Sequence, residues 1–88
     1  MSSILNTYAR KKISFKKGKG CYLYANDGKK YLDFVQGIAV NSLGHCHSHL
    51  IKTINKQSKK LWHVSNAFTI LEQEKLAQRL CKHTFADA

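Results

Sequence analysis

Apolar and polar side chains alternate between residues 13 and 34, and this alternation is typical of half-buried β-strands. It occurs in three short segments, at residues 13–16, 21–25 and 29–34. Asn26-Asp27-Gly28 separates the last two, and an Asp-Gly pair tolerates the positive φ that a tight hairpin turn requires. Gly18-Lys19-Gly20 predicts the other turn. Together these segments predict a three-stranded antiparallel meander over about residues 13–34.

From about residue 48 the apolar spacing becomes helical. A helix over about residues 48–61 would carry one face formed by Leu50, Ile51, Ile54, Ser58 and Leu61. His47 or Ser48 is its expected N-cap. A second helix is expected over about residues 70–83, because Thr69 and Glu72 form a capping-box pattern ahead of its apolar positions. The predicted fold class is α+β, a meander followed by two helices, with small and irregular residues at 36–44.

Composition limits what the chain can do by itself. Its 88 residues contain no proline and have 43% hydrophobic side chains, which describes one small globular unit. A chain of this size is too small to enclose a large cofactor in its own core. Fifteen basic against five acidic residues give a net charge of +10, and residues 1–60 hold 12 of the basic and 2 of the acidic side chains. Such an excess attracts polyanions.

Lysine pairs interleaved with tyrosines make a small basic nucleic-acid-binding module the alternative function. No RNP-like aromatic motif or GXXG loop occurs in the sequence, and this argues against nucleic acid as a partner. Paired lysines beside polar turns are also the usual composition of a solvated face.

The cysteines and histidines bear on compartment and metal binding. Cys21, Cys46 and Cys81 lack CxxC spacing, and no apolar stretch is long enough for a membrane span, so we expect reduced thiols, a cytoplasmic protein and no membrane partner. The basic first 26 residues superficially suit a transit peptide, but the alternation from residue 13 does not. His45-Cys46-His47 with His49 lacks the spacing of zinc sites. We predict no metal there, but a polar turn before a helix, with one histidine bonded to backbone.

Several stretches, taken in order, resemble one family. They are residues 6–10, 18–24, 27–34, 61–66 and 84–87. The most telling is GIAVNSLGHCH at residues 37–47, which resembles the GIAVN-x-LGH-x-H signature near the N-terminus of class III, pyridoxal-phosphate-dependent aminotransferases, notably those that act on N-acetylornithine. The resemblance covers essentially the whole chain. It implies that residues 1–88 are an incomplete domain, the N-terminal segment of the type I aminotransferase fold.

The resemblance also implies a reaction and its requirements. The reaction is amino transfer from N-acetylornithine to 2-oxoglutarate in arginine biosynthesis, with pyridoxal phosphate as cofactor and a small-molecule amino-acid substrate. In this family the phosphate-binding loop, the aspartate that pairs with the pyridine nitrogen and the Schiff-base lysine lie beyond the matched segment. We therefore expect no catalytic residue, no bound cofactor and no activity in this chain alone. The expected partners are the remainder of an aminotransferase chain or a homodimer partner.

By position, the resemblance implies substrate-pocket roles for Tyr8, Gly37, Ile38, Ser65 and Asn66. Tyr8 matches a tyrosine at the substrate end of the pocket, and its phenol is able to hydrogen-bond an amino-acid substrate. Gly37 and Ile38 match residues that shape the substrate channel, and Ser65 and Asn66 match a loop beside the active site near the dimer interface. The chain departs from the family at Ser48, where proline is usual.

Overall fold

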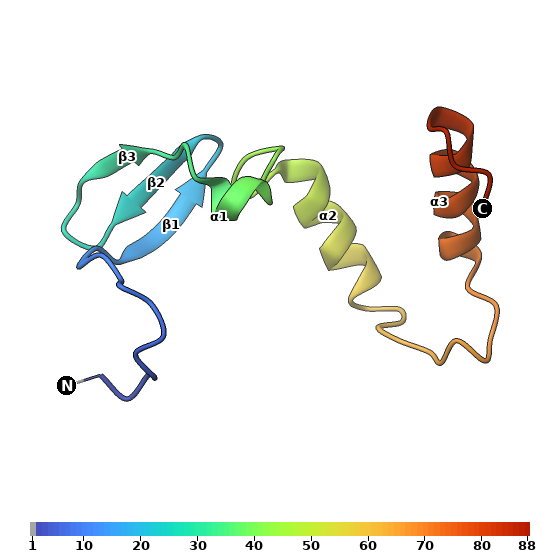
Figure 1. Ribbon diagram of the computed structural model, residues 1–88, viewed down its shortest axis with the longest axis horizontal. Coiled ribbons are helices and arrows are strands. Elements are labelled where there is room, and N and C mark those ends of the chain that lie inside the picture. The colour runs from blue at the N-terminus through green and yellow to red at the C-terminus, as the bar shows by residue number, and fades with distance from the viewer. Residues whose placement is uncertain (1) are drawn as a thin grey trace. The chain divides into compact units, whose positions relative to one another are not determined.

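The computed structural model describes residues 2–88, in two compact units that divide after residue 55. The elements are β1 (Phe15–Lys19), β2 (Tyr22–Ala25), β3 (Lys30–Leu32), α1 (Gln36–Ala39), α2 (Ser48–Gln57) and α3 (Leu71–His83) (Figure 1). The first unit holds the strands, α1 and most of α2. The second holds the end of α2, a connecting segment and α3.

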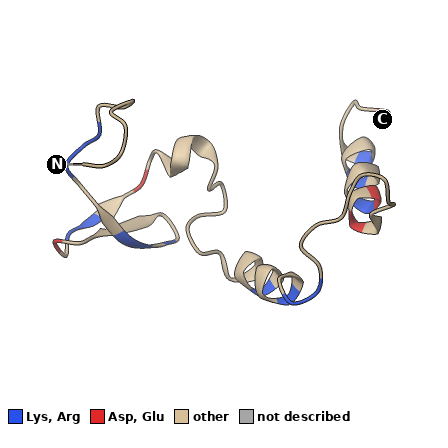
Figure 2. Cartoon of the chain, turned by 90° about the horizontal axis from the view of Figure 1, so that it is seen from below, with Lys and Arg blue, Asp and Glu red and all other residues tan. Residues whose placement is uncertain are grey.

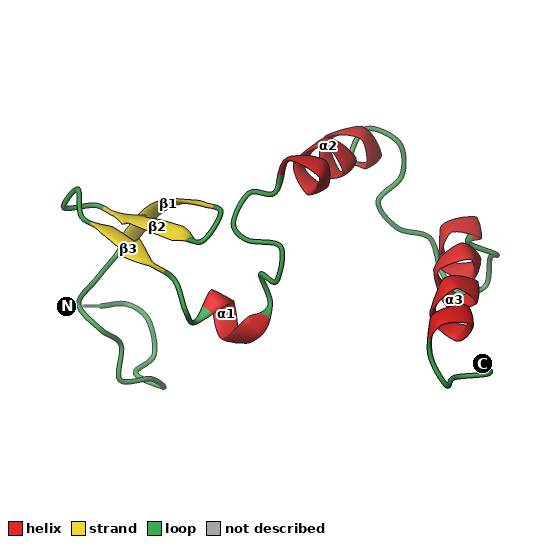
Figure 3. Cartoon of the chain, turned by 90° about the horizontal axis from the view of Figure 1, so that it is seen from above, coloured by secondary structure: helices red, strands yellow, loops and turns green. Residues whose placement is uncertain are grey.

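The three strands form one antiparallel sheet in the order β1-β2-β3, as Figure 3 shows. Gly18 pairs with Leu23, and Leu23 pairs with Tyr31 on the other side. This arrangement confirms the predicted meander followed by helices. Such short strands need a third neighbour, because a strand pair alone is barely stable in water.

The turn between β2 and β3 has the chemistry that the Asp-Gly pair predicts. Gly28 has a φ of +87°, which glycine adopts without steric cost. Its N–H donates to the carbonyl of Ala25 at 3.1 Å, and the carboxylate of Asp27 accepts from the N–H of Lys29 at 3.0 Å. The hairpin is therefore fixed by its own turn residues.

The other predicted turn is wrong in its position. Gly18 and Lys19 belong to β1 and pair with β2, so the reversal of the chain lies at Gly20 and Cys21, where Gly20 has a φ of +58°. Gly18 is instead needed for space. A Cβ on it would stand 2.7 Å from Cγ of His45, so the histidine ring lies directly over this strand.

The ends of the helices differ from the predicted ones. α2 ends at Gln57 instead of about residue 61. After it the chain forms a turn, in which the N–H of Lys60 donates to the carbonyl of Gln57 at 2.9 Å. The predicted capping box of Thr69 and Glu72 is wrong, because α3 begins one residue later. Its N-cap is Ile70, which makes no side-chain capping bond.

Little of the described chain is buried. Ala25, at 2% exposure, is the one fully buried apolar residue among residues 2–88, and α2 and α3 contain no buried residue. Leu71, Leu76 and Leu80 on α3 are all more than half exposed. None of the described helices is long and apolar enough to cross a membrane. The sheet alone therefore provides the small interior of the molecule.

Candidate functional site

The segment after the sheet, predicted to be irregular, forms a single helical turn of reversed hand. φ is positive at each residue of α1: +52° at Gln36, +63° at Gly37, +63° at Ile38 and +60° at Ala39. The flanking Val35 and Val40 have ordinary φ values of −87° and −81°. The left-handed conformation is therefore confined to four consecutive residues.

Four backbone hydrogen bonds close this turn. The carbonyl of Val35 accepts from Ile38 and Ala39 at 2.9 and 3.0 Å, and the carbonyl of Gln36 accepts from Val40 and Asn41 at 2.9 and 3.0 Å. The apolar side chains around it face solvent, since Phe34 is 89% and Ile38 is 86% exposed. α1 thus presents an apolar rim.

The left-handed conformation is costly for this sequence. It brings Cβ close to the following carbonyl oxygen and costs about 1–2 kcal/mol per non-glycine residue. Gly37 escapes the cost, but Gln36, Ile38 and Ala39 do not, and the β-branched Ile38 is a genuine outlier at positive φ. The three together store roughly 3–6 kcal/mol of strain. Strain of this size persists only where surrounding groups hold it, and such positions cluster at functional sites.

Asp33 is the residue that holds the start of the turn. Its Oδ1 accepts hydrogen bonds from the N–H groups of Val35 and Gln36 at 2.9 and 3.0 Å. The side-chain amide of Gln36 returns a hydrogen bond to the Asp33 carbonyl at 2.9 Å. Because β3 ends at Leu32, Asp33 is the first residue after the sheet, and its carboxylate binds the backbone that follows.

The other oxygen of this carboxylate binds a residue distant in sequence. Nε2 of His45 donates to Oδ2 of Asp33 at 2.6 Å, and the two side chains are only 17% and 6% exposed, respectively. The backbone of His45 also bonds reciprocally to Gly20, at 2.8 and 3.0 Å. The ring of His45 therefore bonds a carboxylate and is not the histidine side chain expected to bond to backbone. We call these two residues the Asp33–His45 pair.

These contacts lower the pKa of the Asp33 carboxyl below its ordinary value. The largest cause is the hydrogen bond from the N–H of Gln36, followed by the one from His45, and both favour the charged form. The carboxylate therefore stays ionised over the physiological range and remains an acceptor for all its partners.

Two open depressions adjoin α1, with volumes of about 560 and about 400 Å³. The larger lies against the apolar face of the sheet and is lined by Phe15, Leu23, Tyr31, Asp33, Gly37 and His45, among others. The rings of Phe15 and Tyr31 meet edge to face there, 5.7 Å apart. One predicted pocket residue, Gly37, thus lies at a hollow with an aromatic floor and a polar end.

The other predicted pocket residues lie elsewhere. Tyr8 is exposed, and the guanidinium carbon of Arg10 lies 5.7 Å from its ring centroid. Ser65 and Asn66 belong to the second unit, where Ser65 forms a local turn by accepting from the N–H groups of Ala67 and Phe68. Of the five residues, the structure joins only Gly37 and Ile38, in α1.

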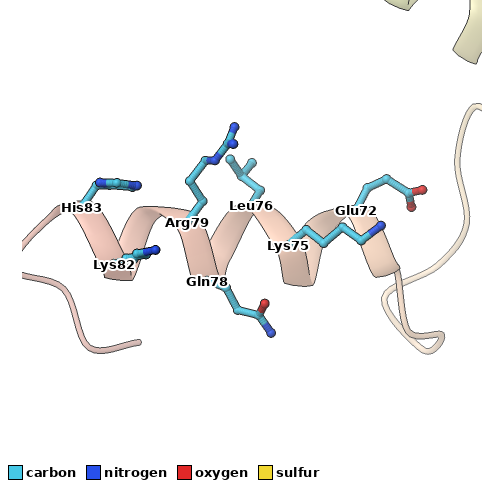
Figure 4. A pocket seen from close by; sticks show the side chains of 7 residues that line it. All are labelled: Glu72, Lys75, Leu76, Gln78, Arg79, Lys82 and His83. Carbon is cyan, nitrogen blue, oxygen red and sulfur yellow. The ribbon is translucent and has the colours of Figure 1, made fainter.

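The depression on α3, with a volume of about 680 Å³, has no opposite wall. All of its lining residues belong to this one helix, and Figure 4 shows Leu76 and Gln78 on opposite sides of it. The hollow is the space between side chains of one exposed helix, so a ligand there would contact α3 alone.

The histidine-rich segment does not assemble a metal site. Within residues 2–88 no three His, Cys, Asp or Glu side chains converge on one point. His45 is bonded to Asp33, and Cys21, Cys46 and Cys81 are free thiols.

Lys17, Tyr24 and Lys30 are paired across the strands, so their side chains share the face of the sheet opposite to Leu23 and Tyr31. Figure 2 marks the lysine positions of the strands in blue. Lys17 and Lys30 lie over the rings of Tyr24 and Tyr22, with Nζ at 4.7 and 3.9 Å from the ring centroids. These are favourable cation–π distances. A nucleic-acid base would have to displace the lysines before it stacked on either ring, so this geometry does not favour a nucleic-acid platform.

Residues 5–88 match the family model described as aminotransferase class-III. The chain belongs to this aminotransferase family. The matched range includes the Asp33–His45 pair, α1 and both larger helices. The resemblance carried by residues 37–47 is thereby confirmed, and the site just described belongs to an aminotransferase segment.

Among its relatives is the acetylornithine aminotransferase of Agrobacterium fabrum, which is 50% identical over 84 residues, covering 96% of this chain and 21% of that protein. A solved N-acetylornithine aminotransferase from Stenotrophomonas maltophilia superposes with a TM-score of 0.76 at 33% identity, over 85% of this chain and 21% of the other. The ornithine aminotransferase of Toxoplasma gondii, whose active site is partially occupied by PLP, gives a TM-score of 0.73 at 31% identity, over 77% of this chain and 16% of the other. The chain thus spans about a fifth of these relatives and corresponds to their N-terminal segment.

The residues around α1 do not by themselves fit pyridoxal phosphate. The cofactor requires a lysine amine and an acid at its ring nitrogen. No lysine lines either depression beside α1, and Asp33, the one acid there, is engaged by His45, Val35 and Gln36. A complete cofactor site would need groups from outside the described residues.

Proposed function

We propose that this chain is the N-terminal segment of an acetylornithine aminotransferase, which transfers the amino group of N-acetylornithine to 2-oxoglutarate in cytoplasmic arginine biosynthesis. The observation that carries the proposal is the 50% identity to a relative of that activity over 84 of the 88 residues. The segment supplies pocket walls, while the pyridoxal phosphate and its lysine belong to the remainder of the enzyme. Alone, the chain is inactive.

In this proposal α1 borders the substrate channel. Gly37 leaves room for an acylated side chain because it has no side chain of its own, and Ile38 offers an aliphatic wall beside it. Tyr8 provides a phenol at the substrate end, and Ser65 and Asn66 border the site near the dimer interface. The support for these roles is their position in the family motif, together with the exposure of the Ile38 and Tyr8 side chains.

The exposed apolar side chains support a large protein partner. The described chain has one fully buried apolar residue, and large apolar side chains on α1, α2 and α3 face solvent. Contiguous exposed apolar surface marks an interaction site in soluble proteins. We therefore assign these faces to packing against the rest of an aminotransferase subunit and against its dimer partner.

A hybrid enzyme tests the proposal. In this hybrid, the chain replaces the matched 84-residue segment of the Agrobacterium fabrum relative. We expect the hybrid to bind pyridoxal phosphate and to convert N-acetylornithine and 2-oxoglutarate, with the kcat/KM for N-acetylornithine within about tenfold of the parent enzyme. A folded hybrid without this activity contradicts the proposal.

The isolated chain provides the complementary test. Mixed with pyridoxal phosphate and treated with borohydride, it should yield no stoichiometric adduct at a specific lysine, because no lysine lines the hollows at α1. The intact hybrid, treated in the same way, is the positive control. A specific adduct on the isolated chain overturns the claim that the segment is inactive by itself.

A further inference from the structure

Residues 33–45 contain a feature that the pocket roles do not explain. The turn α1 is left-handed although three of its four residues are not glycine, so its conformation must be imposed by neighbouring groups. Local sequence offers little to impose it, since Gln36, Ile38 and Ala39 all prefer negative φ.

Two groups hold this turn, one at each end. At its start, Oδ1 of Asp33 accepts the N–H groups of Val35 and Gln36. Beyond its end, the chain returns through Gly44 to His45, whose ring donates to Oδ2 of the same carboxylate at 2.6 Å. Both ends of the segment are therefore tied to one carboxyl group.

His45 itself is fixed to the sheet. Its backbone forms two hydrogen bonds with Gly20, and its ring lies over Gly18, where a Cβ would stand 2.7 Å from the ring carbon Cγ. Gly44 approaches the same strand end so closely that a Cβ on it would lie 3.0 Å from the carbonyl oxygen of Gly20. The Asp33–His45 pair thus fixes the position of α1 relative to the rigid sheet.

We propose that Asp33, held by His45, is a positioning residue for substrate binding: it keeps α1 left-handed and so sets where Gly37 and Ile38 stand against the substrate. The inference rests on the proposed function, which puts these two residues at the substrate channel. Asp33 touches no reacting atom. It acts through the backbone of α1.

The test uses the hybrid enzyme with Asp33→Asn. Asparagine keeps an acceptor oxygen but loses the charge that binds His45, so the turn is expected to relax. We expect the KM for N-acetylornithine to rise about tenfold while kcat changes less than about threefold, because the pocket wall moves and the reacting groups do not. Asp27→Asn is the matched control, since Asp27 also accepts a backbone N–H but stands in the β2–β3 turn, and it should leave both constants unchanged.

A second substitution separates positioning from a general loss of stability. Glycine adopts positive φ freely, so Ala39→Gly in the Asp33→Asn background should lower the KM again, to within about threefold of its value in the Ala39→Gly single variant. A general destabilisation lowers the fraction of folded enzyme, which reduces the apparent kcat and leaves the KM unchanged, so it predicts no effect of Ala39→Gly on the KM. An unchanged KM in Asp33→Asn, or an increase that Ala39→Gly does not reduce, overturns the inference.

Crystal structures of the hybrid and of its Asp33→Asn variant give a readout that does not depend on activity. We expect positive φ at Ile38 in the hybrid and a negative φ in the variant. Positive φ in both overturns the inference even when the hybrid is active. An inactive hybrid with these two conformations instead contradicts the proposed function and leaves the positioning of α1 supported.

Discussion

α1 and α3 are opposite kinds of helix. α1 has four left-handed residues, of which the three that are not glycine are strained, and it is held by the Asp33–His45 pair. α3 has thirteen residues of ordinary hand, with Glu72 and Glu74 in its first turn and Lys82 and His83 in its last, an arrangement that suits the helix dipole. Yet α3 buries none of its residues. The strained element is supported by its own unit, whereas the favourable one lacks support.

The comparison of α1 with α3 shows which contacts stabilise each helix. The shape of α1 is determined by groups between residues 18 and 45, so it is a property of this segment. α3 carries an apolar row at Leu76 and Leu80 with nothing over it in the described chain, and amphipathic helices gain most of their stability from packing of such a row. Substitutions in the two elements should therefore respond differently to the presence of the remaining enzyme.

The largest expected effect is at Leu76. Leu76→Ala should destabilise the hybrid enzyme by about 2–5 kcal/mol, because a packed leucine leaves a cavity, but should change the isolated chain by less than about 0.5 kcal/mol. Chemical denaturation of the hybrid and circular dichroism of the chain measure the two. Gln78→Ala, on the opposite side of α3 in Figure 4, is the control and should be nearly neutral in both. Equal effects of Leu76→Ala in both proteins would mean that α3 stays uncovered in the enzyme.

The next effect is at Gly18, beneath the ring of His45. Gly18→Ala places a methyl group 2.7 Å from Cγ of His45 and should destabilise the hybrid by about 1–3 kcal/mol as the ring is displaced. It should also raise the KM for N-acetylornithine, as Asp33→Asn does. Urea unfolding and steady-state kinetics measure these changes. A stable variant with an unchanged KM would show that the ring position does not matter for α1.

A pair of identical substitutions gives a smaller effect with opposite signs. Ala77→Gly in α3 should cost about 1 kcal/mol, the usual penalty of glycine in a right-handed helix. Ala39→Gly in α1 should instead be neutral or stabilise by up to about 1 kcal/mol, because it removes left-handed strain. Thermal unfolding of the two hybrid variants compares them directly. Two losses of similar size would contradict the left-handed conformation of α1.

The smallest effect is the pH dependence of the Asp33–His45 pair. The folded pKa of Asp33 lies below its ordinary value of 3.8, so its charged form contributes stability above that pH, and the contribution is lost as the pH falls through the folded pKa. Asp33 faces His45 and the N–H groups of Val35 and Gln36. The stability difference between the hybrid and its Asp33→Asn variant should be constant near neutral pH and shrink in acid. Urea titrations down to about pH 3 measure it, and a difference that grows in acid would contradict this sign.

Local signals predicted the elements that are local in origin. The Asp-Gly pair fixed the β2–β3 turn through bonds among neighbouring residues, and alternation predicted the sheet. The capping box failed because its pattern requires Thr69 as the N-cap, whereas the chain places Ile70 there. The sequence pattern places Gly18 in a turn. The structural requirement for glycine at this position comes from the ring of His45, which lies 27 positions further along the chain.

The same limit applied to the site. Residues 37–47 identified the family and directed attention to Gly37 and Ile38, but the sequence gives no local sign that α1 is left-handed. The sequence pattern makes His45 a candidate metal ligand and Asp33 a strand residue, whereas the structure joins the two across 12 positions. The available signal was the set of glycines at 18, 20 and 44, which mark close approaches of backbone and ring.

The reciprocal bonds between Gly20 and His45 have a consequence for how the enzyme is made. All the groups that determine the hand of α1 lie between residues 18 and 45, so they are present once residue 45 has left the ribosome. The conformation of α1 can therefore form from residues 18–45 alone. Under the proposed function, this segment is a preformed wall against which the remainder of an aminotransferase would assemble.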